Sequence, residues 1–449
     1  MFDSFNAAAP IKKRRLSPWI LIISGFAAVI LLGTALLMLP ISSKGEPAPF
    51  GDALFTSVSA VCVTGLVVRD TAASWTGFGQ AVLLVLIQIG GFGVVTLAAA
   101  FTMLSGRRIS LFARSTIQST MAAPQLGGIV RLTKFVLLGT LAVELVGALA
   151  LLPSFVLRYG AGGIWPAVFH SVSAFCNAGF DIMGAKTGEF SSLTSFSADA
   201  AVSIPVMLLI IIGGIGFITW NDFRAHGLKI KKFSIQSKAA LMVSGILILV
   251  PAIWFFFADL YKMPFGERLL CSLFQAVTPR TAGFNTADLN SLSGSSRGLM
   301  TALMLIGGSP GSTAGGMKTT TLALLIANVA ATFKKSADVQ LFKRRVEPAA
   351  VRTASTLFVM YLTLFFIGAA AISAIEGLPI SDCAFETASA IGTVGLTLGI
   401  TPTLGTASRC ILMALMFTGR VGGLTLVYAL LPGSGAVVSK LPLESITVG

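Results

Sequence analysis

The chain of 449 residues is 55% hydrophobic and only 11% charged. This composition is typical of polytopic membrane proteins, and it excludes a large soluble domain because the polar segments between apolar runs are short. The net charge of +14 would suit a nucleic-acid partner, but most basic residues flank apolar runs, as the positive-inside rule predicts for cytoplasmic segments. We therefore expect a lipid bilayer as the partner of these residues and no nucleic acid. The basic clusters lie at residues 12–15, 107–134, 224–238 and 334–352.

The first predicted membrane unit covers residues 17–104, after a cytoplasmic N-terminus at 1–16. Its first apolar run, 17–39, is too long for the core of a signal peptide and long enough to span a bilayer. A shorter run at 52–63 forms a helix of roughly 18 Å at most, which cannot cross a hydrocarbon core of about 30 Å. We interpret it as a re-entrant pore helix, followed by a second spanning run at 77–104.

The same order of a long, a short and a second long apolar run recurs three more times along the chain, which indicates one structural unit repeated in tandem. The predicted fold class is an all-α polytopic membrane protein of eight transmembrane helices, with four helix–pore helix–helix units around a pseudo-fourfold pore. We expect it in the cell (plasma) membrane with both termini cytoplasmic. The further segments are 105–222 (a cytoplasmic connection and unit two), 223–333 (unit three), 334–430 (a cytoplasmic connection and unit four) and 431–449 (a C-terminal tail). Their long runs are 130–157, 196–220, 236–258, 297–332, 350–375 and 407–430, and their short runs are 166–176, 266–277 and 381–391.

A phrase of small and polar residues that includes a glycine follows each short run, and a Phe lies nine or ten residues before that glycine. Glycine permits backbone angles that turn successive carbonyls toward one axis, where oxygens from four strands can replace the water of a dehydrated cation. The phrases hold no carboxylate, so we expect a monovalent ion. The alternative, four glycine caps that end buried helices, does not explain four phrases in register. The predicted filter segments are Val63, Thr64, Gly65 and Leu66; Asn177, Ala178, Gly179 and Phe180; Thr281, Ala282, Gly283 and Phe284; and Thr393, Val394, Gly395 and Leu396.

Glycine pairs recur in the second long run of each unit, and small residues there favour close helix packing in lipid. Unit three departs from the others, because a run of Gly, Ser and Pro interrupts its second helix and cannot remain helical. We interpret this run, within the loop 307–317, as an intramembrane gate below the filter; an external loop is excluded because 299–306 is too short to span alone. The gate residues are Gly307, Gly308, Ser309, Pro310, Gly311, Ser312, Thr313, Gly315 and Gly316.

Two charged residues lie at the depth of this gate. Lys318 follows the loop and Arg420 interrupts the last apolar run. Intramembrane charges are costly and usually face an interior cavity, so both are candidates to bind loop carbonyls and hold the gate shut. For Lys318, snorkelling to the cytoplasmic interface is an equal alternative. For Arg420, the role in the pore is favoured. A further hypothesis pairs Arg280 with Glu386, beside two filter phrases.

The sequence gives little support for a metal site, a disulfide framework, an enzyme active site or a nucleotide site. The five Cys residues show neither metal-ligand spacing nor a disulfide framework, and the two His residues are too few for a metal site. No cluster of titratable groups within the spans suggests an enzyme. No Gly-rich nucleotide fingerprint opens a soluble βαβ unit, so we expect no nucleotide site in this chain.

Four motifs resemble the Trk/Ktr/HKT superfamily of potassium transporters: the stretches 278–285, 392–397 and 419–422, and the loop that ends at Lys318. The resemblance runs from about residue 17 to the C-terminus, and the absence of two extra leading helices is similar to KtrB-type membrane subunits of Ktr systems. It implies a potassium-translocating homodimer gated by a cytosolic ring of nucleotide-binding RCK (KtrA-like) subunits. Glycine in all four filters implies K⁺ as the transported ion, with Na⁺ dependence left open. Cys62 and Cys176 depart from the residues usual in the family.

A secondary transporter that couples Na⁺ or H⁺ to another small solute is the alternative function. Such folds use inverted repeats, whereas the helix count places all four phrases of this chain on the same side. The sequence leaves open whether flux is channel-like or coupled, and which RCK partner and nucleotide act on it.

Overall fold

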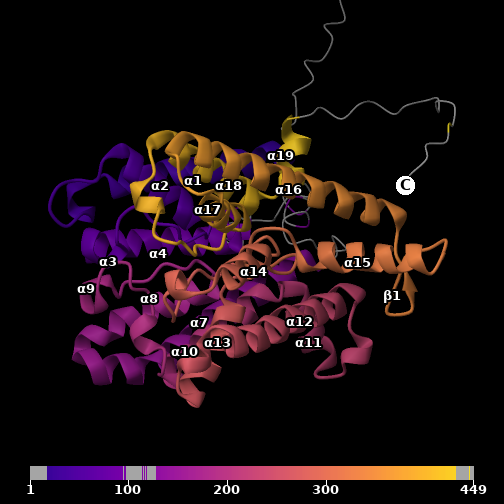
Figure 1. Cartoon of the computed structure of the whole chain (residues 1–449), viewed down its shortest axis with the longest axis horizontal. Helices are drawn as coiled ribbons and strands as arrows, with labels where there is room; N and C mark the ends of the chain where they lie inside the picture. Colours follow the sequence, from indigo (N-terminus) through magenta and orange to yellow (C-terminus); the bar gives the residue numbers. More distant parts are fainter. Residues whose placement is uncertain are drawn as a thin grey trace, which may run out of the picture.

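The computed structural model describes residues 18–94, 96, 97, 114, 116, 118, 128–430 and 444. The predicted N-terminal segment 1–16, most of the connection at 98–127 and nearly all of the tail 431–449 lie outside these residues. The described chain is mostly helical and has almost no strand, which confirms the predicted all-α class (Figure 1). Its strands, β1 (Gln340–Leu341) and β2 (Arg344–Arg345), pair as a short antiparallel hairpin.

The helices follow the predicted order of long, short and long in four successive segments. The short helices start and end within a few residues of the predicted runs. By length and composition, four described helices can cross a membrane, and a fifth if one bent pair counts as a single span. The first helices are α1 (Pro18–Leu37), α7 (Ile129–Tyr159), α12 (Ile235–Ala258) and α16 (Pro348–Glu376), and the short helices are α2 (Phe50–Val61), α8 (Ile164–Phe175), α13 (Phe265–Val277) and α17 (Ile380–Gly392).

The second helix of every segment is broken, whereas the sequence predicted an interruption only in unit three. Each of the other breaks has a glycine at positive φ, which is Gly93 (φ 80°), Gly216 (φ 91°) or Gly422 (φ 89°). Glycine adopts this conformation at little cost, so the chain can turn there. The second helices are α4 (Gly77–Phe92); α10 (Ala200–Gly214) and α11 (Phe217–His226), bent by 93°; α14 (Gly294–Met304) and α15 (Thr319–Phe333); and α18 (Thr406–Val421) and α19 (Gly423–Leu430).

Short elements connect these helices. Two single-turn helices, α3 (Thr71–Ser74) and α9 (Gly184–Thr187), follow the first and second predicted filter segments. The 3₁₀ turns are Pro40–Ser42, Gly160–Gly163, Thr194–Phe196, Ile230–Lys232, Leu260–Lys262, Leu289–Ser291 and Thr401–Thr403.

The short helices form the buried centre of the molecule, and the first helices form its apolar exterior. The Phe of each short helix is buried, at Phe55, Phe169, Phe274 and Phe385. In contrast, the outer faces of α1, α7, α12 and α16 expose large apolar side chains, as suits a surface in contact with lipid. The exposed side chains include Leu31, Leu32, Leu145, Val146, Leu249, Val250, Phe366 and Ile367.

The first and last segments of the chain are neighbours. Helix α18 packs on α2, and α19 packs on α1. Figure 1 shows the indigo helices of the first segment beside the yellow helices of the last, with the magenta helices of the second segment below them. The four segments therefore form a closed arrangement with the short helices inside.

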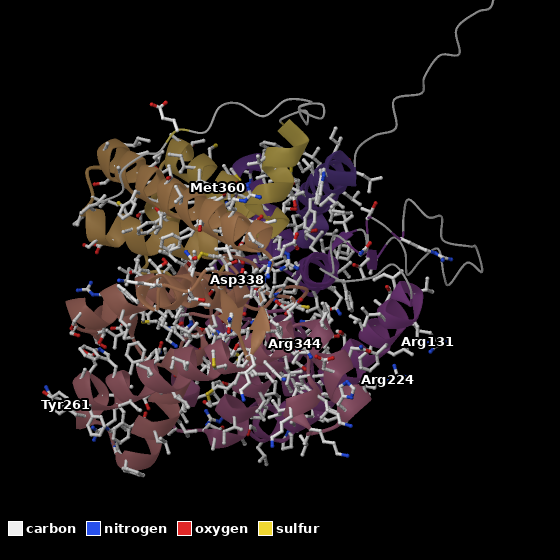
Figure 2. The ribbon with its side chains drawn as sticks, turned by 90° about the vertical axis from the view of Figure 1, so that its right-hand side faces the viewer. Arg131, Arg224, Tyr261, Asp338, Arg344 and Met360 are labelled. Carbon is white, nitrogen blue, oxygen red and sulfur yellow. The ribbon has the colours of Figure 1, made fainter. Side chains whose placement is uncertain are left out.

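Basic side chains gather at one end of the molecule. Figure 2 looks at the end where the β1–β2 hairpin projects, and it labels Arg131, Arg224 and Arg344 there. Arg224 lies over the ring of Phe135, 4.7 Å from its centroid, and Arg345 pairs with Asp338 at 3.2 Å. The three labelled arginines come from three of the predicted basic clusters, 107–134, 224–238 and 334–352.

Candidate functional site

The C-terminal end of each short helix leads directly into a predicted filter segment, and a hydroxyl side chain in the last turns of the helix or just after it fixes the segment. Gly65 N donates to Ser59 Oγ at 3.1 Å, and Gly395 N donates to Ser389 Oγ at 3.0 Å. In the other two units the hydroxyl instead donates to a carbonyl, Ser173 to Phe180 O at 2.7 Å and Thr278 to Phe284 O. All four segments are therefore bonded to the helix that precedes them.

Positive φ angles alternate along all four segments. The first residue of each segment has φ between 51° and 59°, and the glycine two positions later has φ between 69° and 96°. Left-handed angles on alternate residues turn successive carbonyls to the same side of the chain, and glycine accepts them without steric cost. The residues are Val63, Asn177, Thr281 and Thr393 at the first position, and Gly65, Gly179, Gly283 and Gly395 at the third.

The four glycines form a closed ring. A Cβ atom built on any one of them would lie 2.2–2.7 Å from the carbonyl oxygen that precedes the next glycine around the ring. Because real Cβ atoms do not approach so closely, only glycine fits at these positions. The neighbours in order are Gly65 to Ala178 O, Gly179 to Ala282 O, Gly283 to Val394 O, and Gly395 to Thr64 O.

One side of the ring opens into a cavity of about 410 Å³, which we call the filter cavity. All four glycines line it, together with Asp70, Asp181 and Asp288. No group of three or more His, Cys, Asp or Glu side chains among the described residues could hold a metal ion. An ion in the ring would therefore bind backbone carbonyls and the hydroxyls beside them. The buried hydroxyls of Thr64, Thr281 and Thr393 have no hydrogen-bond partner in the described part of the chain.

On the other side of the ring lies the loop between α14 and α15. Its backbone bonds to the broken ends of neighbouring helices: Ser309 N donates to Gly214 O at 2.9 Å, and Phe217 N donates to Gly311 O at 2.7 Å. The loop also donates from Gly316 N to Gly419 O at 3.2 Å. Polar backbone inside a membrane needs such partners, so the glycine breaks of the second helices and the loop satisfy one another.

The loop touches two of the four filter segments. The Thr313 hydroxyl lies 2.8 Å from Asn177 Oδ1 and 3.1 Å from Phe175 O, and its single proton is shared between these two acceptors. A Cβ on Gly315 would lie 2.2 Å from Thr393 Oγ1, so the loop backbone runs directly against the fourth segment. The loop therefore lies across the inner end of the ring, in contact with the second and fourth segments.

Arg420 joins the loop to the end of α4. Its guanidinium donates to Thr313 O in the loop and to Gly90 O and Gly91 O, the last at 3.0 Å. These carbonyls belong to the last turn of α4, where helices leave acceptors without partners. Lys318 Nζ instead donates within its own loop, to Ala314 O at 2.7 Å and Gly315 O at 3.2 Å. Both cations line a second cavity of about 160 Å³, the loop cavity.

The structure brings together all four predicted filter segments, the loop and both cations, but the hypothesis that Arg280 pairs with Glu386 is wrong. Glu386 accepts hydrogen bonds from Thr397, Leu398 and Thr401, whereas Arg280 Nε has no partner among the described residues. Both residues lie beside a filter phrase in the sequence, which suggested a pair, but Glu386 bonds within its own unit and Arg280 lines a small cavity with residues of α10 and α12. Sequence reasoning also missed the Thr313–Asn177 contact, which joins residues 136 apart.

Fold and site together define a helical membrane protein in which four short helices lead into a ring of glycines and backbone carbonyls. The cation transport protein family TrkH matches residues 11–434, and this chain belongs to that family. It is 40% identical to the potassium/sodium uptake protein NtpJ of Enterococcus hirae, over 97% of this chain and 98% of that one. It is 39% identical to the Ktr system potassium uptake protein B of Bacillus subtilis, over 93% and 94% of the two chains.

A solved structure shows the same fold. The potassium transporter TrkH from Vibrio parahaemolyticus superposes with a TM-score of 0.75, covering 94% of this chain and 86% of that one at 20% identity. The similarity extends over nearly the whole chain, so the helical architecture described above is the architecture of the family.

Proposed function

We propose that this chain is the potassium-translocating membrane subunit of a Ktr-type uptake system. The observation that carries the proposal is the closed ring of four glycines, each against the carbonyl of the next segment. Carbonyl oxygens arranged in this way replace the hydration shell of a monovalent cation. The printed names of the relatives, potassium uptake and potassium/sodium uptake, support K⁺ as the ion and Na⁺ as a second candidate. The filter is formed by 63–66, 177–180, 281–284 and 393–396.

The proposal includes a gate formed by the loop 307–317 with Lys318 and Arg420. Its support is the position of the loop against the inner end of the ring and its hydrogen bonds to the surrounding helix ends. The four units keep the boundaries predicted from the sequence. The end that carries the basic residues faces the cytoplasm of the cell membrane in this proposal, as positive residues favour. A homodimer and a cytosolic RCK ring complete the system, and the ring supplies the nucleotide site.

The test is K⁺ uptake at limiting external K⁺ in cells that lack their own K⁺ transporters, with wild type compared with Gly283→Ser. A side chain on Gly283 would lie 2.5 Å from Val394 O, so the variant distorts the ring. Wild type is expected to restore growth, and the variant is expected to lose this or to become sensitive to Na⁺. Absence of rescue by wild type, with and without a co-expressed RCK subunit, would contradict the proposal.

A second prediction concerns the contact between loop and filter. Thr313→Val keeps the shape of the side chain but removes the hydroxyl that bonds Asn177 Oδ1 and Phe175 O. A hydrogen bond of about 1 kcal/mol holds the loop in place, so its loss is expected to raise K⁺ flux about fivefold in proteoliposomes. Thr313→Ser keeps the hydroxyl and is the control, with flux like wild type. Equal fluxes in all three proteins would show that this bond does not restrain the loop.

A further inference from the structure

A fully buried carboxylate lies behind the fourth filter segment. Glu386 follows the anchoring Phe385 in α17, and its side chain is 0% exposed. Its Oε1 accepts from the Thr397 hydroxyl at 2.5 Å and from Leu398 N at 3.0 Å, and its Oε2 accepts from the Thr401 hydroxyl at 2.6 Å. These donors begin one residue after Leu396, the last residue of the filter segment. Glu386 therefore holds the chain where it leaves the filter.

Among the residues that the structure describes, no cation pairs with this carboxylate. None of the ion pairs between described residues involves Glu386, and all three of its donors are neutral. A buried carboxyl group is costly unless hydrogen bonds satisfy its oxygens, and here both oxygens are satisfied by one short segment. The contact of Glu386 with the rest of the site is thus a set of hydrogen bonds with fixed geometry.

The chains that follow the other three filter segments are joined to one another by bonds between units, and the chain after filter one is also held to its own short helix, where Arg69 Nε lies 2.6 Å from Asp52 Oδ2. Phe190 N donates to Asp70 Oδ2 at 2.8 Å, which joins the chain after filter two to the chain after filter one. Leu193 N donates to Asn285 O at 3.1 Å, which joins the chains after filters two and three. Among the described residues, the hydrogen bonds that leave residues 397–401 go to Glu386, apart from the local bonds of Thr403 to Ile400 O. Glu386 therefore holds the chain after filter four from within unit four.

Within the described chain, the side chains at the same position in the other units make no hydrogen bond to a filter segment, although the His170 ring lies 6.2 Å from the ring of Phe284. Thr56, His170 and Gln275 follow their own anchoring Phe and are buried like Glu386. Thr56 donates back to Asp52 O, His170 Nδ1 contacts Pro166 O, and the amide of Gln275 has no partner in the described chain. A polar residue at this position is therefore general in the repeat, but among the described residues only Glu386 uses it to hydrogen-bond the chain that leaves a filter.

We infer that Glu386 is a positioning residue that sets the ion preference of the fourth filter segment. Val394 O and Gly395 are contact points of the ring with the third and first segments. If the chain after Leu396 is released, these carbonyls relax and the ring loses the spacing that distinguishes K⁺ from Na⁺. The inference rests on the proposed function, since it assigns this residue a part in the selectivity of the same filter.

The test measures K⁺ uptake and its inhibition by Na⁺ in proteoliposomes that contain the full chain. Glu386→Leu removes every acceptor and is expected to lower discrimination between K⁺ and Na⁺ about tenfold. Glu386→Gln can still accept from Thr397 and Leu398 and can donate to the Thr401 oxygen, so it is expected to discriminate like wild type. Asp382→Asn removes the same charge one turn earlier in α17, where Asp382 accepts from the Ser381 hydroxyl, and is expected to change nothing.

Each outcome decides between hypotheses. Unchanged discrimination in Glu386→Leu overturns the inference, and so does an equal loss in Glu386→Gln, because the charge rather than the geometry would then matter. If Glu386→Leu does not fold, Thr397→Val and Thr401→Val each remove one donor and are expected to lose discrimination several-fold; wild-type behaviour of both overturns the inference. A wild-type protein that passes no K⁺ would contradict the proposed function instead.

Discussion

Replacing Gly395 with Ala is expected to reduce K⁺ uptake at limiting external K⁺ about a hundredfold. Gly395 has φ 96°, and a Cβ at this residue would lie 2.2 Å from Thr64 O. A left-handed angle costs a side chain 1–2 kcal/mol, and forcing an atom into a packed site costs a similar amount. The clash is relieved only if a filter carbonyl moves. The ring therefore loses about 3 kcal/mol of ion binding, which corresponds to about two orders of magnitude in uptake.

Gly399 provides a matched control four residues further along the chain. It has nearly the same angle, φ 91°, but a Cβ on it would meet nothing within 4 Å. Gly399→Ala therefore imposes the backbone cost without the clash, and we expect uptake within about threefold of wild type. The measurement compares initial uptake rates at equal amounts of protein in the membrane. An equal loss in both variants would show that backbone strain, and not the approach to Thr64 O, sets the effect.

Much of the site could be predicted because its signals are local. The spacing from Phe385 to Gly395, which recurs with little change in the other units, predicted the short helix and the segment after it. Helix α17 begins and ends within a residue of the expected run. Composition within each phrase predicted glycine at positive φ, since few other residues tolerate it. Which carbonyl each glycine approaches is a property of the assembled ring, and spacing along the chain carries no information about it.

The breaks in the second helices show why the rest could not be predicted. A glycine in an apolar run either allows close packing or ends the helix, and the sequence around Gly93, Gly216 and Gly422 does not distinguish these. The structure shows both outcomes within a few residues: a Cβ on Gly90 would lie 2.2 Å from Val61 O, while Gly93 ends α4. The deciding partner is the loop of unit three, whose backbone groups bond the broken ends of α10 and α18.

Arg420→Gln is expected to raise K⁺ flux through proteoliposomes about tenfold in the absence of any soluble partner. The guanidinium joins a loop carbonyl, Thr313 O, to Gly90 O and Gly91 O at the end of α4. Hydrogen bonds from charged donors stabilise by about 1.5–3 kcal/mol, so losing one bond between loop and wall corresponds to an order of magnitude or more in the fraction of open loop. Removal of a fixed cation from the loop cavity also lowers the barrier for a permeating cation.

Lys318→Gln separates these two effects. Lys318 lines the same cavity, but its ammonium bonds only Ala314 O and Gly315 O among the described residues, so it joins the loop to itself. If the bond between loop and helix α4 restrains the gate, Arg420→Gln should raise flux more than Lys318→Gln, with ion preference unchanged in both. Equal increases would assign the effect to charge in the cavity. Unchanged flux in Arg420→Gln would contradict a gate at this loop, because the variant removes the side chain that fixes it to α4.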